Sequence, residues 1–331
     1  MNFYRNVVSH TCENGMRIFV LPRPGHSVEV ECFVKTGSIH EGRYLGSGLS
    51  HFLEHMLFQG CRNYPGTSAA DTIDRLGGSV NAYTSFDVTC YTEDIPSNEV
   101  ENWAKIQAER FKNCVIRGFH TELETVYEEK NMSLTRDARK VYEQTLAALF
   151  PHHPYGTQTV LGTQEDLKNP SITNIKNYFK TWYVPNNMAI CLSGDFDPDQ
   201  MIATIDKYFG DMQPNPNLPK LNLPKETDIT TPVVREVLGP EAENVTLAWR
   251  FPGAASKELE TLQIVSQILY NGQAGLIDLD LTQQQKTLSA YCYPMAMSDY
   301  SAFMMAGRPK AGQTLDEVKD LLLGELKKLR D

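Results

Sequence analysis

The chain has 331 residues, of which 41% are hydrophobic and 22% charged, as in a globular protein large enough for two ordinary domains. Its formal net charge of −10 argues against a nucleic-acid partner, which would need clustered Lys and Arg, and disfavours an anionic membrane surface. No run approaches 18 consecutive apolar residues, so no membrane partner or membrane-spanning helix is expected.

The cysteines and the N-terminus bear on the compartment. The seven cysteines are scattered and form no CxxC pair, which favours reduced thiols over a disulfide framework. The first residues lack the charged-then-apolar layout of a secretory signal. Together these features predict a cytoplasmic location, although a chain without its targeting segment would have the same pattern.

In chain order, the first two hundred residues alternate between strand and helix patterns. Strands are predicted at 16–21, 28–34, around residue 81, at 86–92 and at 188–193; helices are predicted around residue 51, at 99–111, 120–150 and 172–183, and after residue 195. The mixture predicts an α+β fold in which a mixed β-sheet is covered by helices on one face.

A proline-rich stretch divides the chain. Residues 213–224 contain four prolines, which cannot sustain a helix or a central strand. We therefore expect a first domain at 1–212, an extended linker at 213–226 and a second domain at 227–331.

The second domain repeats the order of the first in degenerate form. Val245 to Phe251 alternate towards Gly253 as the earlier strand does towards Gly37, and a helix at 258–269 follows. Ala290-Tyr291 echoes Ala82-Tyr83. The second copy lacks counterparts of the long helix and the closing strand, so it is expected to be truncated and the chain to be the front part of a longer protein.

The segment His51-Phe-Leu-Glu-His55 has the spacing of a metal site. On a helix each residue advances about 100°, so His51 and His55 fall on one face, roughly 40° apart, where two imidazoles can bind one zinc ion. Glu54 lies on the same side, within reach of a water molecule on the metal. Two histidines at this spacing also occur as ordinary surface residues.

A third ligand is expected from another helix, because hydrolytic zinc sites commonly use three protein ligands. Glu122 and Glu129 are seven residues apart and share a helix face within about 20°. Glu129 could bind the metal while Glu122 holds an imidazole; Glu128 points about 100° away. A solvated helix face is the alternative for each of these acids.

Several stretches, in order, resemble the pitrilysin/insulinase family of zinc metallopeptidases, whose zinc motif is the inverted form HxxEH. The resemblance runs from about Asn14 to the end of the chain and corresponds to the N-terminal portion of the family's longer members. The stretches are His51–Phe58, Gly78–Thr84, Glu122–Glu129, His153–Gly156 and Tyr183–Asp195. It implies zinc ligation by His51, His55 and Glu129, a general base at Glu54, a supporting acid at Glu122, and substrate binding along the strand of Asn81 and Ala82.

The implied function is zinc-dependent hydrolysis of unfolded peptides bound along a strand edge. The implied partners are the peptide substrate and a second half, on the same longer chain or on a second subunit, that closes a chamber. The alternative is a non-catalytic or processing-partner subunit of the same family, although such members usually lack part of the zinc motif. The second domain carries Leu262 to Leu269 at the corresponding place and should bind no zinc there.

Overall fold

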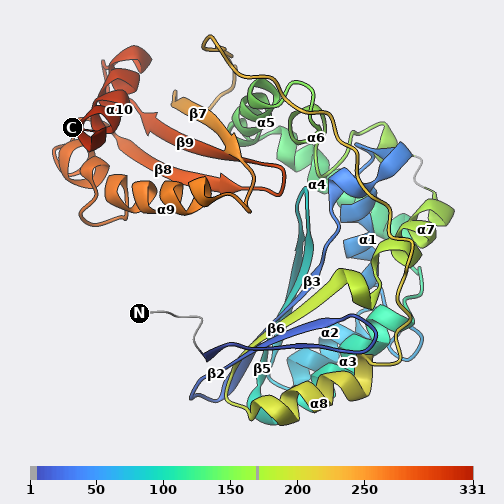
Figure 1. Ribbon diagram of the computed structural model, residues 1–331. Coiled ribbons are helices and arrows are strands. Elements are labelled where there is room, and N and C mark those ends of the chain that lie inside the picture. Colours follow the sequence, from blue (N-terminus) through green and yellow to red (C-terminus); the bar gives the residue numbers. More distant parts are fainter. Residues whose placement is uncertain (1–5, 169–170, 331) are drawn as a thin grey trace. The chain divides into compact units, whose positions relative to one another are not determined.

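The computed structural model describes residues 6–168 and 171–330, which divide into two compact units (Figure 1). The first unit consists of the described residues of 1–132 and 158–223, and the second of those of 133–157 and 224–331. Residues 133–157 therefore group with the second unit although they precede the linker. The division into domains at residues 212 and 226 stays a prediction.

The first unit is built on a six-stranded sheet. Its strand order is β1 (Val8–Thr11), β2 (Arg17–Pro22), β6 (Met188–Gly194), β3 (Ser27–Val34), β5 (Thr89–Pro96) and β4 (Ser79–Thr84). β2 and β6 are parallel and the other neighbours antiparallel, which confirms the mixed sheet. The strand predicted from residue 86 begins later, because Ser85 closes a turn with the backbone of Val88.

Helices cover one face of this sheet (Figure 1), as predicted. Along β3, Val28, Val30, Cys32 and Val34 are completely buried, while the intervening side chains are more accessible. This alternation turns one row of apolar side chains towards the helices. The helices of the unit are α1 (Leu49–Phe58), α2 (Ser68–Arg75), α3 (Val100–Lys112), α4 (Phe119–Leu134), α7 (Ile172–Trp182) and α8 (Pro198–Phe209).

The single helix predicted at 120–150 is wrong, because the chain forms two helices there. α4 ends at Leu134, and α5 (Asp137–Leu149) begins after Arg136, whose backbone is extended. The residues between the two helices are Thr135 and Arg136, and Thr is a weak helix former. Asp137 also exchanges hydrogen bonds with Glu241, since the backbone N–H of each donates to the carboxylate of the other. These contacts fix a new helix start.

The second unit repeats the core of the first, which confirms the duplication. Its sheet has the order β7 (Val245–Pro252), β9 (Tyr300–Arg308), β8 (Ser289–Ala296), equivalent to β3-β5-β4. α9 (Lys257–Leu269) and α10 (Leu315–Arg330) share its apolar core, and α5 and α6 (Pro154–Thr157) complete the unit. The three described strands are all antiparallel to their neighbours. The described part of this sheet therefore has no equivalent of the parallel β2–β6 pair of the first unit.

Two glycines mark the same joint in both units. A Cβ atom on Gly37 would lie 2.4 Å from the carbonyl oxygen of Ser85, at the turn between β4 and β5. A Cβ atom on Gly253 would lie 2.0 Å from the carbonyl oxygen of Ser298, at the turn between β8 and β9. In each unit the first strand of the repeat therefore ends against the hairpin turn of the other two.

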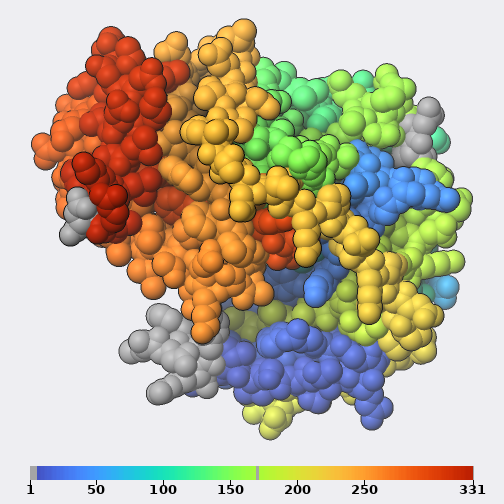
Figure 2. All heavy atoms as spheres, turned by 45° about the horizontal axis from the view of Figure 1, so that its top comes forward, coloured from blue at the N-terminus to red at the C-terminus, as the bar shows by residue number. Residues whose placement is uncertain are grey.

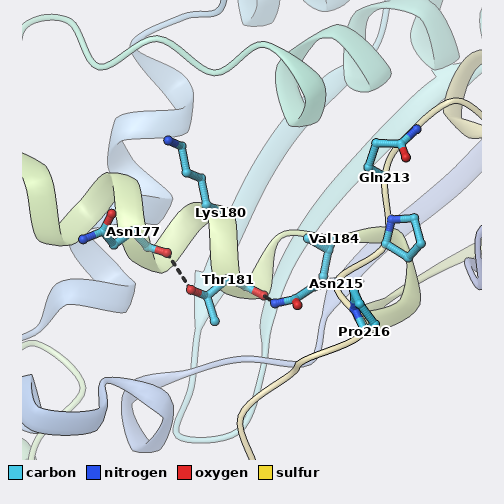
Figure 3. A pocket seen from close by; sticks show the side chains of 8 residues that line it. Asn177, Lys180, Thr181, Val184, Gln213, Asn215 and Pro216 are labelled. Atoms are coloured by element: carbon cyan, nitrogen blue, oxygen red, sulfur yellow. Dashed lines mark hydrogen bonds between the residues drawn. The ribbon is translucent and has the colours of Figure 1, made fainter.

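The proline-rich segment forms no helix or strand from residue 213 to residue 244. It runs over the surface (Figure 2). At its start, Asn215 donates a hydrogen bond of 3.1 Å to the carbonyl of Thr181 on α7, beside an open hollow of about 480 Å³ (Figure 3). In the described part of the chain, no helix combines the length and apolarity that crossing a bilayer requires.

Candidate metal centre

α1 carries two histidines and a glutamate on the side opposite to its core contacts. Phe52, Leu53, Met56 and Leu57 are almost completely buried in the core of the first unit. The helical period then turns residues 51, 54 and 55 away from that core. His51 and Glu54 are nevertheless 8% and 6% exposed, so the site lies in a sheltered environment.

The start of α1 is held by a carboxylate from outside the helix. Gly48 at the N-cap has no side chain to accept the first N–H groups, and Glu41 replaces it. Its Oε1 accepts hydrogen bonds from the backbone N and the Oγ of Ser50, at 2.9 and 2.8 Å, and its Oε2 accepts one from the Ser47 N–H. Burial raises the pKa of Glu41 to about 7, against the opposing effect of these hydrogen bonds.

α4 places a third potential metal ligand next to the two imidazoles. Oε2 of Glu129 lies 3.7 Å from Nε2 of His51 and 3.5 Å from Nε2 of His55. Two ligand atoms that are each about 2.1 Å from a tetrahedral zinc ion lie about 3.4 Å apart. The three side chains therefore have the donor types and nearly the spacing of a zinc site. Among the described residues, no other group of three or more potential metal ligands lies this close together.

Glu122 contacts the opposite side of one imidazole. Its Oε1 accepts a hydrogen bond of 2.6 Å from Nδ1 of His55, and its Oε2 accepts one of 2.5 Å from the Gln59 side chain. A proton held at Nδ1 leaves Nε2 of His55 available as a ligand. Burial lowers the pKa of His55, but the hydrogen bonds to Glu122 and Glu129 and the nearby Glu54 outweigh it and raise the pKa to about 9. The negative charges of Glu122, Glu129 and Glu54 also favour the binding of a cation beside His55.

Glu54 is held by the edge strand. Oγ1 of Thr84, on β4, donates a hydrogen bond of 2.6 Å to Oε2 of Glu54. Burial is the largest effect on this carboxyl group and raises its pKa, against the lowering effects of Thr84 and His55. A buried carboxylate with a raised pKa is suited to take up and return a proton.

β4 lies at the edge of the six-stranded sheet, so no described strand pairs with its outer side. The backbone N–H of Ala82 donates to Oδ1 of Asn81 at 2.9 Å. In an antiparallel strand the N–H and C=O of one residue point to the same side. Ala82 therefore presents both groups to the free edge, and Asn81 covers one of them.

The structure brings together His51, His55, Glu129, Glu54 and Glu122, and β4 with Asn81 and Ala82 meets this cluster through Thr84. Glu128, the acid that the helical spacing disfavoured, is exposed and accepts a hydrogen bond from Asn131. The hollow in Figure 3 is lined by residues of α7 and the linker and by Val184, and includes none of the site residues.

Sequence reasoning missed three supporting side chains: Glu41, Gln59 and Thr84. Thr84 was within reach of such reasoning, because it follows Ala82 at an alternate position of one strand and so shares its face. Gln59 directly follows the zinc-motif helix. No sequence pattern around Glu41 indicates that it caps α1, because its contacts with Ser47 and Ser50 depend on how the chain folds back.

Comparisons with known proteins show the family of this chain. Residues 19–163 match the family model "Insulinase (Peptidase family M16)", and residues 171–331 match "Peptidase M16 inactive domain". The chain belongs to the insulinase family of peptidases, family M16. The second description agrees with a second unit in which α9 carries no zinc motif.

The relatives are named as zinc proteases. The chain is 27% identical to "Uncharacterized zinc protease YmxG" of Bacillus subtilis, over 92% of this chain and 74% of that protein. It is 26% identical to "Zinc protease PqqE" of Helicobacter pylori, over 97% of this chain and 74% of that protein. The fold is similar to the crystal structure of a protease from Helicobacter pylori, with a TM-score of 0.86, 24% identity, and coverage of 98% of this chain and 79% of that one.

Proposed function

We propose that this protein is a zinc-dependent endopeptidase that hydrolyses peptide bonds in unfolded peptides. The observation that carries the proposal is the convergence of His51, His55 and Glu129 from two helices, with Glu54 beside them. The relatives' names give zinc as the metal, and the donor set of two imidazoles and one carboxylate fits it.

When bound by these three residues, zinc would polarise a carbonyl group and make water a nucleophile at neutral pH. Glu54 would act as general base, with Thr84 holding one carboxylate oxygen at 2.6 Å. The same carboxyl group would return the proton to the leaving amine. Glu122 would keep the proton of His55 at Nδ1, so that Nε2 faces the ion.

The substrate would extend β4 as an added strand. Ala82 offers a backbone N–H and C=O at the free edge, and the Asn81 side chain that covers the N–H would move aside. Backbone pairing of this kind gives affinity without demanding a particular sequence, and it requires an extended peptide. This suits an enzyme whose substrates are unfolded.

We also propose that efficient turnover needs a second half, because this chain covers only 38% of the structurally similar protease PqqL of Escherichia coli and 36% of pitrilysin. The chain alone would then cut slowly. We also propose that the protein works in a reducing cytoplasm. The non-catalytic alternative is favoured only by the description of the second matching model as an inactive domain, and that model begins after the zinc-motif residues.

The test is cleavage of a quenched fluorescent peptide by zinc-loaded protein in excess over substrate, with and without a chelator. Glu54→Gln should keep its zinc and lose most of the cleavage, a drop of roughly 10²- to 10⁴-fold. Glu124→Gln, an exposed carboxylate on α4, serves as the matched control and should leave the rate unchanged. Cleavage that survives both zinc removal and Glu54→Gln would contradict the proposal, and absence of cleavage by the zinc-loaded wild type would favour the non-catalytic alternative.

A further inference from the structure

Two cysteines face each other directly where α1 and α3 end. Cys61 follows α1 and Cys114 follows α3, and they form an isolated antiparallel bridge. The N–H of Val115 donates to the carbonyl of Gly60 at 3.3 Å, and that of Arg62 donates to the carbonyl of Asn113 at 3.0 Å. Hydrogen bonds that flank a pair in this way define a non-hydrogen-bonded pair, whose Cα atoms are about 4.5 Å apart. A disulfide requires about 4.4 to 6.8 Å.

The backbone at Cys61 is already fixed in this geometry. Its N–H donates to the carbonyl of Tyr64 at 2.8 Å, and its carbonyl accepts a hydrogen bond of 2.9 Å from Nη1 of Arg117. Both groups therefore point away from Cys114, as the pairing requires. The bridge is thus maintained by hydrogen bonds on both sides, and a bond between the two sulfur atoms would need no movement of the chain.

The other five cysteines lack this arrangement. Cys90 lies opposite Phe33, and Cys32 lies opposite Tyr91 and Ile190. Cys191 is paired with Phe19 and Glu31. Cys12 lies outside the paired strands of the first unit, and Cys292 belongs to the second unit, opposite Met305. Direct opposition of two thiols is therefore specific to Cys61 and Cys114.

We propose that Cys61 and Cys114, both free thiols in this structure, form a disulfide when the protein meets a small organic disulfide such as oxidised glutathione. The thiolate of Cys114 attacks one sulfur of the small disulfide, which forms a mixed disulfide and releases one thiol. The sulfur of Cys61, losing its proton, then attacks the sulfur of Cys114 and releases the second thiol. The two cysteines lose two electrons, and the small disulfide gains them.

Accessibility sets the order and the speed of these steps. Cys61 is completely buried, whereas Cys114 is partly exposed, so the first attack starts from Cys114. Burial raises the pKa of the Cys114 thiol to about 12, so little thiolate exists at neutral pH. Oxidation should therefore be slow at pH 7 and faster as the pH rises, and reduction of the bond should likewise be slow.

The disulfide would join the ends of two core helices. Cys61 lies two residues after Gln59, whose side chain donates to Glu122, and Cys114 lies two residues after the end of α3. The bond would close a long loop and so restrict the unfolded chain, which raises stability. This stabilisation depends on neither zinc nor catalysis, so its test is independent of the proposed function.

The experiment incubates folded protein with oxidised glutathione at pH 8.5, blocks the remaining thiols by alkylation, and maps the peptides by mass spectrometry. The expected product is one peptide pair joined through Cys61 and Cys114, lighter by two hydrogen atoms, with the other five cysteines alkylated. The melting temperature should rise by on the order of 5 °C. Dithiothreitol should reverse both changes.

Two variants complete the test. Cys114→Ser should show neither the joined peptide nor the rise in melting temperature, and Cys12→Ser, the matched control, should show both. Wild-type protein oxidised in guanidinium should yield mixed pairings, since the selectivity comes from the fold. Native protein that retains both thiols at equilibrium, pairs them with other cysteines, or carries only glutathione on Cys114 would overturn the proposal.

Discussion

Nδ1 of His55 lies 2.6 Å from Oε1 of Glu122, while Nε2 of the same ring lies 3.5 Å from Oε2 of Glu129. One imidazole is thus held between two acids of a single helix, seven residues apart. One acid contacts the nitrogen that would carry a proton, and the other contacts the nitrogen that would bind a metal. This arrangement explains why both acids must lie on the same face of α4.

The first prediction separates the two adjacent acids on α4. Glu129→Gln should reduce zinc affinity by more than the roughly 10- to 100-fold expected from losing an outer contact, because it removes a direct ligand. Glu128→Gln should leave zinc affinity unchanged, since that side chain is exposed and contacts Asn131. Titration with a competing chelator measures both, and equal losses would contradict the ligand assignment.

The second prediction concerns Glu122. Glu122→Gln retains the shape of the side chain but removes its charge, so the hydrogen bond from Nδ1 of His55 loses its charged acceptor. Zinc affinity should fall by about 10- to 100-fold without unfolding the protein. Competition titration with circular dichroism as the folding control tests this. Glu124→Gln is the control on the same helix, and an unchanged affinity in Glu122→Gln would show that Glu122 does not support the site.

The third prediction concerns the hydroxyl group that holds Glu54. Thr84→Val removes the donor to Oε2 at nearly constant volume, and Thr84→Ser keeps it. A hydrogen bond to a charged group contributes about 1.5–3 kcal/mol, so cleavage should slow by roughly tenfold or more in Thr84→Val while bound zinc stays constant. Thr84→Ser should recover most of the rate. Equal rates in the two variants would exclude a role for the hydroxyl group.

The fourth prediction is a pH dependence of stability that arises from Glu93, a buried carboxyl group on β5 of the first unit. Glu93 is 2% exposed, and burial raises its pKa to about 7, against the lowering effects of Arg110 and Trp103. An exposed glutamate in the unfolded chain titrates near 4.3. Between these values the folded protein holds a proton that the unfolded chain has released. The contribution to the free energy of unfolding is therefore complete at low pH and is lost as the pH rises towards 7.

Glu93→Gln should remove this slope. Between pH 5 and 7, wild type should lose stability relative to the variant by about 1 kcal/mol per pH unit, and above pH 8 the difference should be constant. Urea unfolding at four pH values measures it. Glu124→Gln should follow wild type at every pH. Wild type that gains stability relative to Glu93→Gln as the pH rises would mean that the pKa of Glu93 is lowered instead.

Local sequence patterns predicted the elements that carry strong periodicity. The alternation of Val28, Val30 and Val34 gave β3, and the HxxEH spacing gave α1 with its two imidazoles on one face. The pairing of Glu122 with Glu129 also followed from the helical repeat. These features depend on residues close in sequence, so a single segment contains the information.

The missed features depend on contacts between distant residues or on weak local signals. β1 is exposed throughout and is defined by its pairing with β2, and α2 buries only Ile73, so neither has a row of buried apolar side chains. The break before Asp137 involves Glu241, more than a hundred residues later. The opposition of Cys61 and Cys114 requires the ends of two helices to meet, which spacing along the chain does not reveal.

The tight contact at Gly37 ties the end of β3 to the turn that immediately follows Thr84. Even a single methyl group there would push that turn outward and carry the hydroxyl away from Glu54, so Gly37→Ala should impair both folding and proton transfer. Gly253→Ala would force open the equivalent turn in the second unit, which does not hold the proposed general base Glu54. Because the two glycines occupy equivalent positions in the two units, comparison of the alanine variants would distinguish an effect on folding from an effect on proton transfer.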